Sequence, residues 1–225
     1  MKNNVRLHIW GDYACFTRPE MKAERVSYDV ITPSAARGIL SSIHWKPAIN
    51  WVIDKIYVLK PIRFETIRRN ELGNKIPQNK ITAAMKRNSL EKLYTIIEED
   101  RQQRAATVLK DVAYVIEAHI VLTDQAGESD NLNKHLEMFQ RRAAKGQCFR
   151  HPCMGVREFP ANFCLIEENE ALPQTALSGA ELDQDLGWML HDIDFNHNNT
   201  PHFFRAKMQN GVITVPPFYS EEVKL

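Results

Sequence analysis

The adjacent residues Lys134 and His135 are a pair of side chains that could carry out chemistry together. An imidazole gains and loses its proton near neutral pH, so His135 can exchange a proton with a reacting group. The ammonium group of Lys134 can stabilise negative charge on phosphate oxygens. Adjacent Lys-His pairs also arise by chance, so the pair indicates phosphate chemistry only together with its surroundings.

A second histidine, His44, lies where a predicted helix ends. Thr32 can cap the N-terminus of this helix, and Pro33 suits its first turn. Pro47 favours extended backbone just before it, so we expect the helix to end by about Trp45. His44 then lies at the negative end of the helix dipole, which favours the protonated imidazole. This side chain either caps the helix or takes part in chemistry.

The segment that contains Lys134 and His135 predicts an amphipathic helix over 131–145, ended by Gly146. Its apolar side chains share one face and should pack on a sheet. Four cations share the opposite face, and His135 lies on the boundary between the two. Four cations within about three turns suit a phosphate backbone, although an ordinary solvated face is the alternative. The four are Lys134, Arg141, Arg142 and Lys145.

Two other groups of residues could in principle bind a metal ion. Cys148, His151 and Cys153 are closely spaced, but zinc sites usually have four ligands at recognised spacings. The stretch 191–197 holds two histidines and two aspartates that could serve a metal-dependent nuclease, but they alternate with apolar residues as on a strand edge. We therefore expect no metal and no cofactor.

The net charge of +1 hides an asymmetry along the 225 residues. Residues 1–160 carry 26 Lys and Arg against 18 Asp and Glu, whereas residues 161–225 carry 3 against 10. A basic body followed by an acidic region indicates a polyanion as partner, although chance could produce the same distribution. No run of 18 apolar residues exists, so we expect no membrane span. Four irregularly spaced cysteines and the absence of a signal peptide favour the cytoplasm.

The order of predicted elements indicates an α+β fold. Strands are expected at 5–10, at 49–69 (one strand, or two collinear ones with a bend at Pro61), at 108–122 and at 154–159. The two helices come after the first and third of these strands. This is the ferredoxin-like, RRM-like βαββαβ pattern, with residues 70–103, helical over 81–100, inserted in its central hairpin.

The character of the chain changes after Pro160. An acidic loop is followed by the strand-like segments WMLHDIDF and HFFRAKM, and Asn210-Gly211 suits a hairpin turn before the next strand. We expect a catalytic, RNA-binding domain over 1–160 and a small antiparallel β-sheet subdomain over 161–225.

Several blocks of the chain resemble one known family. They are WGDYACFTRPE, VSYDVITPSAARGILSSIHWKP, INWVIDKIYVLKPIRFETIRRNEL, VLKDVAYVIEAH and Asn133-Lys134-His135 with the basic helix that follows. In this order, from about Val5 to about Phe163, they are similar to the type I-C (Dvulg subtype) CRISPR-associated pre-crRNA endoribonucleases.

The resemblance implies cleavage of CRISPR repeat RNA without a metal ion, by attack of a 2′-hydroxyl that leaves a 2′,3′-cyclic phosphate. It also implies that the protein stays on the 5′ handle of the crRNA among the other subunits of the type I-C interference complex. The family's catalytic lysine and histidine match Lys134 and His135, and its catalytic tyrosine position is occupied by His44. His44 and His135 would then form an acid–base pair.

Basic residues around this site are expected to contact RNA phosphates, and RNA specificity should come mostly from hairpin shape. The alternatives are a non-catalytic RNA-binding assembly subunit and a metal-dependent nuclease or DNA-binding protein with affinity for double-stranded DNA. The candidate RNA-binding residues are Arg18, Lys22, Arg25, Arg37, Lys46, Arg68, Arg69, Arg141, Arg142 and Lys145.

Overall fold

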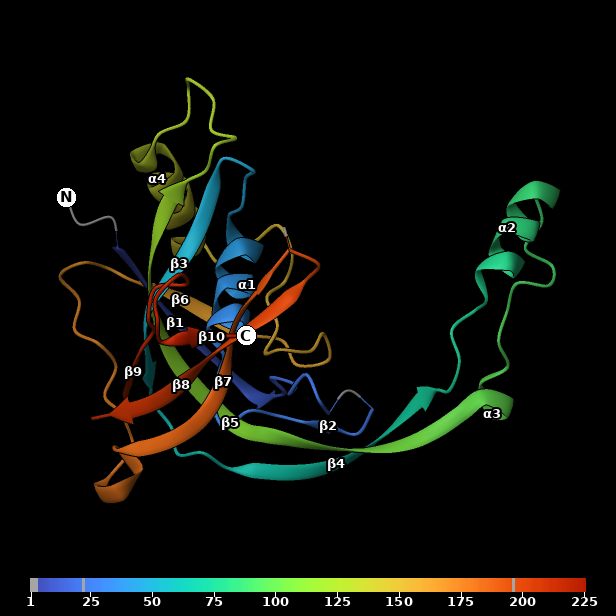
Figure 1. The fold of residues 1–225 in the computed structure, drawn as a ribbon, viewed down its shortest axis with the longest axis horizontal. Coiled ribbons are helices and arrows are strands. Elements are labelled where there is room, and N and C mark those ends of the chain that lie inside the picture. The colour runs from blue at the N-terminus through green and yellow to red at the C-terminus, as the bar shows by residue number, and fades with distance from the viewer. Residues whose placement is uncertain (1–3, 22, 196) are drawn as a thin grey trace.

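Most of the chain is organised around one large sheet. The computed structural model describes residues 4–21, 23–195 and 197–225. Ten strands form the sheet, and nearly all neighbouring pairs are antiparallel. The four helices described are α1 (Pro33–Ile43), α2 (Gln78–Arg87), α3 (Ile97–Asp100) and α4 (Leu132–Ala144), so the fold mixes helices and strands as expected (Figure 1).

The centre of the sheet has the order β3-β5-β1-β6. Strand β5 (Arg101–Leu122) pairs antiparallel with β1 (Asn4–Ala14) on one side and with β3 (Ile49–Val58) on the other. Strand β6 (Asn162–Ile166) pairs antiparallel with the free edge of β1.

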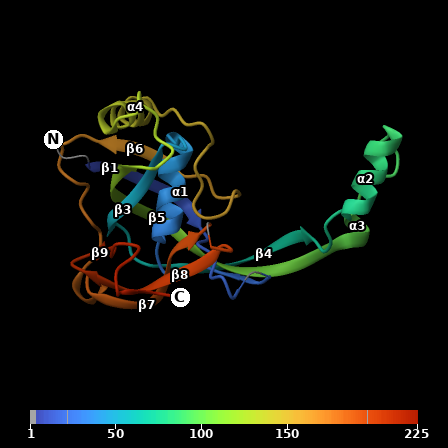
Figure 2. The same cartoon turned by 45° about the horizontal axis from the view of Figure 1, so that its top comes forward.

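Helices α1 and α4 contact this part of the sheet and each other (Figure 2). Alternate β1 residues such as Leu7 and Ile9 are buried in the same core cluster as Ile39 of α1 and Phe139 of α4. Burial of this apolar face is what holds the two helices beside one another, each side chain contributing roughly 1.5–3 kcal/mol.

A long arm extends from the sheet (Figure 1). Strand β3 pairs with the C-terminal half of β5, and β4 (Phe64–Leu72) pairs with its N-terminal half, so the two are collinear with Pro61 in the gap between them, as the sequence indicated. Residues 73–100 at the end of the arm hold α2 and α3. The continuous helix expected over 81–100 is wrong, because Asn88 adopts a left-handed conformation (φ 50°) that ends α2.

The C-terminal strands extend the same sheet. They are β7 (Gln184–Asp194), β8 (Thr200–Gln209), β9 (Val212–Thr214) and β10 (Val223–Lys224), with a short 3-10 helix, η1 (Gly179–Glu181), before them. The turn at Asn210-Gly211 is confirmed, since both residues have positive φ and join β8 to β9. Strand β9 pairs with β3, so the two parts expected on either side of residue 160 share one sheet.

The strand expected over 154–159 is wrong. Gly155 has a φ of 86°, which interrupts extended backbone, and the segment forms turns between an isolated bridge of Cys153 with Pro160. The strand that follows α4 in the sheet is β6 instead. A further two-residue strand, β2 (Arg25–Val26), pairs parallel with β5. Among the described residues, no helix is both long and apolar enough to cross a membrane.

Candidate active site

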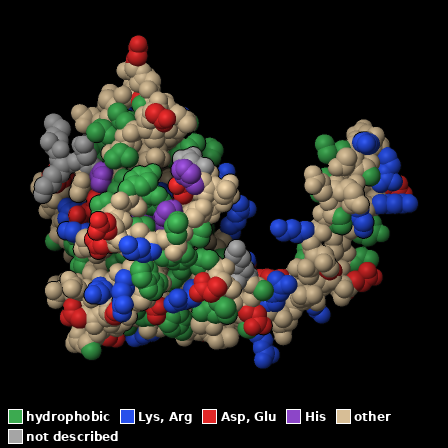
Figure 3. All heavy atoms as spheres, in the orientation of Figure 1, with side chains coloured by type: hydrophobic (Ala, Val, Ile, Leu, Met, Phe, Trp, Pro, Cys, Tyr) green, Lys and Arg blue, Asp and Glu red, His purple; other side chains and the backbone are tan. Residues whose placement is uncertain are grey.

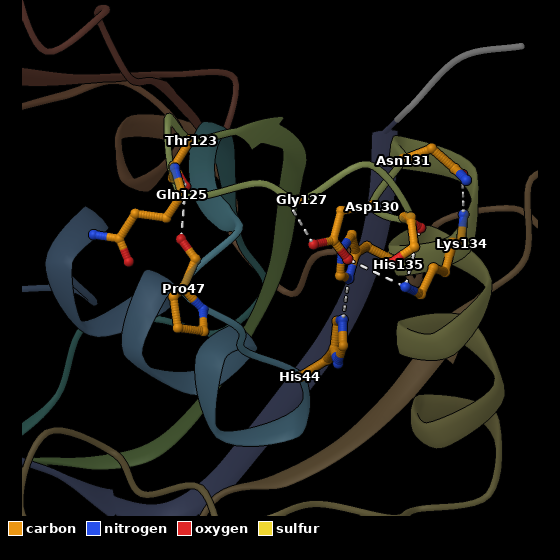
Figure 4. A network of polar contacts seen from close by, with 10 residues as sticks. His44, Pro47, Thr123, Gln125, Gly127, Asp130, Asn131, Lys134 and His135 are labelled. Atoms are coloured by element: carbon orange, nitrogen blue, oxygen red, sulfur yellow. Dashed lines mark hydrogen bonds and ion pairs between the residues drawn. The ribbon is translucent and has the colours of Figure 1, made fainter.

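The end of α1 and the beginning of α4 meet at the candidate site (Figure 4). The hydroxyl of Thr32 accepts from the backbone N–H of Ala35 and starts α1, and the backbone N–H of His44 donates to Leu40 and closes it. The side chain of Asn131 accepts from the backbone N–H of Lys134, at 2.8 Å, and starts α4. Capping residues at both ends therefore determine where the two histidines lie.

His44 and His135 form a buried imidazole pair. Nε2 of His44 lies 3.1 Å from Nδ1 of His135, and the ring centroids are 5.4 Å apart. His44 has no exposed surface, and 1% of His135 is exposed. The structure thus brings together two histidines that are 91 residues apart in the sequence.

The outer end of the pair is closed by the carboxylate of Asp130. One oxygen of Asp130, Oδ1, lies 3.1 Å from Nε2 of His135 and 3.1 Å from Nζ of Lys134. The other oxygen accepts from the backbone N–H of Gly127, at 3.1 Å. Lys134 is the exposed member, with 42% of its side chain accessible, and its ammonium also donates to the backbone carbonyl of Ser129.

The inner end of the pair is closed by Arg142 on α4. Its Nη1 donates to the backbone carbonyl of Ile43, at 3.0 Å, and lies 3.3 Å from Nδ1 of His44. The indole N–H of Trp51, on β3, donates to the backbone carbonyl of His44, at 2.9 Å. The C-terminal carbonyls of α1 are therefore satisfied by side chains from two other elements.

The surroundings keep His44 neutral and Asp130 ionised. Burial, followed by the nearby charge of Arg142, lowers the pKa of His44 to about 4. The expectation that the helix dipole favours a protonated His44 is therefore wrong, because burial and neighbouring cations outweigh it. The backbone N–H of Gly127 and the ammonium of Lys134 lower the pKa of the Asp130 carboxyl.

Comparison with known proteins shows the family of the chain. A family model described as "CRISPR-associated protein (Cas_Cas5)", Cas_Cas5d, matches residues 5–216. The chain belongs to the Cas5d family of CRISPR-associated proteins. The resemblance noted in the sequence is thereby confirmed.

Two relatives of this Cas5d-family chain are named "CRISPR pre-crRNA endoribonuclease Cas5d". One, from Mannheimia succiniciproducens, is 75% identical over 224 residues and covers 100% of both chains. The other, from Thermus thermophilus, is 38% identical over 231 residues, which cover 94% of this chain and 91% of the relative. A solved structure of a CRISPR-associated protein, 22% identical, has the same fold with a TM-score of 0.68 over 99% of this chain and 96% of its own.

The candidate RNA-binding residues of this Cas5d-family chain differ in their surroundings. Several are held by acidic partners: Arg18 by Asp29, Arg37 by Asp192, and Arg69 by Glu71 and Glu158. Arg25 is half-buried, and Arg142 lies in the site rather than on the outer face of α4. Lys22 lies outside the described residues. The exposed members of the set are Lys46, Arg68, Arg141 and Lys145.

Further cations, which the sequence analysis did not single out, lie on the arm. Lys and Arg side chains gather around α2, where Lys80, Lys86 and Arg87 are exposed (Figure 3). Residues 73–100 as a whole hold five Lys and Arg against four Asp and Glu, so most of the positive excess of the first 160 residues lies outside the end of the arm.

The groups considered as metal ligands do not converge. Within residues 4–21, 23–195 and 197–225, no three His, Cys, Asp or Glu side chains lie close enough to hold a metal ion. Cys148 and Cys153 are free thiols, His191 bonds to the carbonyl of Pro216, and Asp192 pairs with Arg37.

Two residues contact the histidine pair although the sequence does not predict it. The sequence does not single out Asp130, and its periodicity places Arg142 among the phosphate contacts on the outer face of the helix. The spacing of Asp130, four residues before Lys134, is a usable signal for an ion pair at a helix start, and the structure shows this pair. Nothing in the local sequence indicates that Arg142 turns toward α1.

Proposed function

We propose that this protein is an endoribonuclease that cleaves CRISPR repeat RNA without a metal ion. One observation carries the proposal: Nζ of Lys134 and Nε2 of His135 converge on a single carboxylate oxygen. Two donors that share one anionic oxygen form the kind of position that a scissile phosphate oxygen would occupy. The printed names of the two relatives support RNA cleavage as the activity of the site.

In the proposed reaction, the 2′-oxygen attacks the adjacent phosphorus and the bond from phosphorus to the 5′-oxygen breaks. The products are a 2′,3′-cyclic phosphate and a 5′-hydroxyl, so one proton moves in total from the 2′-oxygen to the 5′-oxygen. Lys134 stabilises the charge that develops on the phosphate oxygens. His135 is the imidazole whose Nε2 faces this position, and it donates a hydrogen bond to the phosphate oxygens as their charge develops.

His44 acts through His135 in this proposal. Its ring has no exposed surface and both of its nitrogens face protein groups, so it does not reach RNA in this conformation. His44 therefore has a positioning role in this proposal, in place of the acid–base pair expected from the sequence. Lys134 and His135 are the members of the set that would touch the substrate.

In the free protein, the carboxylate of Asp130 occupies the position that we propose for the scissile phosphate. Its carboxylate is ionised, is partly exposed, and uses the two donors that the RNA would need. RNA binding must therefore move Asp130 aside, together with part of the loop between β5 and α4. The exchange replaces one anion by another, so the donors stay satisfied throughout.

The fold is consistent with RNA binding. The strand order β3-β5-β1-β6 with α1 and α4 against it supports a ferredoxin-like, RRM-like core, which RNA-processing proteins use. We propose that the exposed cations Lys46, Arg141 and Lys145 contact RNA phosphates near the site. We further propose that the protein remains on the 5′ handle of the crRNA among the other subunits of a type I-C interference complex.

A cleavage assay tests this function. The purified protein is mixed with labelled repeat RNA, with and without EDTA, and with a substrate that carries a 2′-deoxy substitution at the scissile nucleotide. We expect cleavage in EDTA and none of the deoxy substrate. Binding without cleavage would instead indicate an assembly subunit, and cleavage that EDTA blocks would indicate a metal-dependent nuclease.

Removal of the Asp130 carboxylate is expected to tighten RNA binding. Displacing Asp130 costs the hydrogen bond from Gly127, which the phosphate does not replace, so Asp130→Ala should lower the Kd for uncleavable 2′-deoxy repeat RNA by roughly tenfold. The matched control is Glu128→Ala, which removes the same charge from an exposed position on the same loop. A weaker or unchanged affinity of Asp130→Ala relative to this control would contradict the placeholder role.

A further inference from the structure

We propose that Arg142 is a positioning residue that sets the direction of the hydrogen-bond chain through both histidines. This direction makes His135 face the phosphate position with an N–H group rather than with a lone pair. The consequence for RNA cleavage rests on the proposed function, whereas the hydrogen-bond direction is a property of the free protein.

The chain of hydrogen bonds begins at Arg142, whose guanidinium can only donate hydrogen bonds. A guanidinium has five N–H donors and no acceptor, so Arg142 can face Nδ1 of His44 only if that nitrogen carries a lone pair. The bond from the same Nη1 to the carbonyl of Ile43 holds the guanidinium at this place. Neutral His44 must then carry its proton on Nε2.

The direction set at His44 passes to the second ring. Nε2–H of His44 donates to Nδ1 of His135, which therefore carries a lone pair. Neutral His135 must then carry its proton on Nε2, where it donates to Oδ1 of Asp130. Because an ionised carboxylate only accepts, the two ends of the chain require the same direction.

The opposite direction would leave conflicts at both ends. An N–H of His44 would face an N–H of Arg142, and the lone pair of His135 would face the carboxylate of Asp130. A proton added to Nδ1 of His135 would also have to displace the Nε2–H of His44. Arg142 therefore opposes the reversed direction of the hydrogen bonds.

The charged groups around the pair agree with this assignment. Arg142 and Lys134 approach from α4, Lys46 follows the end of α1, and Asp130 lies on the loop before α4. On the β3 side, the neutral indole N–H of Trp51 donates to the backbone carbonyl of His44 and brings no charge to the pair. The Arg142 charge also contributes to the lowered pKa of His44. Arg142 therefore disfavours a proton on the ring that it contacts.

The test reads the tautomers directly. In full-length protein with ¹⁵N-labelled histidine, ring nitrogens with and without a proton are distinguished by NMR over a pH titration, without RNA. In the unaltered protein we expect His44 to be neutral at pH 7, with the proton on Nε2, and Nδ1 of His135 to carry no proton. Arg142→Met should produce mixed tautomers, and the pair should take up a proton at a higher pH. Arg142→Lys, which retains a donor-only cation, should restore the original pattern.

The matched control is Arg141→Met on the same helix. It removes the same charge from an exposed position, and both histidines should keep the tautomers of the unaltered chain. A merely structural Arg142 would lower the melting temperature on substitution but leave tautomers and titration unchanged. That result, or a proton on Nδ1 of either ring in the unaltered chain, overturns the proposal.

A second readout links the direction to cleavage. In single-turnover assays with saturating repeat RNA, Arg142→Met should reduce the cleavage rate by about 10- to 100-fold, the range known for groups that orient metal-bound imidazoles. The acidic limb of its pH–rate profile should move to higher pH, and Arg142→Lys should recover most of the rate. If the unaltered chain does not cleave repeat RNA, the proposed function fails while the NMR result still decides the role of Arg142. A normal rate and profile for Arg142→Met would overturn the catalytic part.

Discussion

His135→Ala is expected to reduce repeat-RNA cleavage by about 10²–10⁴-fold, because it removes the imidazole that faces the phosphate position. RNA affinity should change little, since His135 is almost fully buried and the exposed cations remain. The measurement is a single-turnover rate constant at saturating RNA, together with a binding titration on uncleavable 2′-deoxy RNA. Loss of the rate with preserved affinity identifies a chemical role.

Two further variants keep this result interpretable. His135→Gln retains an N–H donor but not the imidazole that accepts from His44, so it should recover only part of the rate lost in His135→Ala, with a smaller effect on melting temperature. His151→Ala removes an exposed histidine after α4 and should leave the rate unchanged. Cleavage by a folded His135→Gln at the rate of the unaltered chain would remove His135 from the mechanism.

Gly155→Ala is expected to lower the free energy of unfolding by about 3 kcal/mol or more. A methyl group at this position would lie 2.1 Å from the backbone carbonyl oxygen of Cys15. The neighbouring backbone cannot easily move, because the N–H of Cys15 donates to the carbonyl of Met154 and Cys15 is buried. The φ of 86° adds strain for any residue with a side chain.

Gly146→Ala is the matched control for this prediction. Gly146 also has a positive φ, of 64°, but a methyl group there would have no neighbour within 4 Å. Its cost should be only about 1 kcal/mol, that of the left-handed conformation. Urea denaturation of both variants measures the difference, and equal costs would show that the close approach at Gly155 is unimportant.

The helices that carry the site could be predicted almost to the residue, because their signals are local. Thr32 and Pro33 start α1, and Asn131 and Gly146 bound α4 as the sequence indicated. The strand predicted over 154–159 is wrong because its conformation depends on a distant contact. Its apolar residues suggested a strand, but the conformation of Gly155 is imposed by contact with Cys15, which is 140 positions away in the chain.

The site itself could be predicted only in part. Lys134, His135 and His44 were identified by residue type and by resemblance, and the structure brings the two imidazoles together. The burial of His44, the bridging position of Asp130 and the inward turn of Arg142 depend on how α1 and α4 pack. Packing between segments nearly one hundred residues apart leaves no local pattern, so sequence periodicity placed Arg142 on the outer face.

The pairing of β1 has a consequence for how the chain folds during synthesis. Its partners in the sheet are β5 and β6. Residue 6 pairs with residues 117 and 166, so these pairs cannot form until both residues have left the ribosome. Contacts of such sequence separation close slowly, and both edges of the first strand stay open meanwhile. Both histidines are synthesised during this delay, His44 before residue 117 and His135 after it. Maturation of the site is therefore a late event, and a chain truncated before β6 would lack one of the strands on which α4 rests.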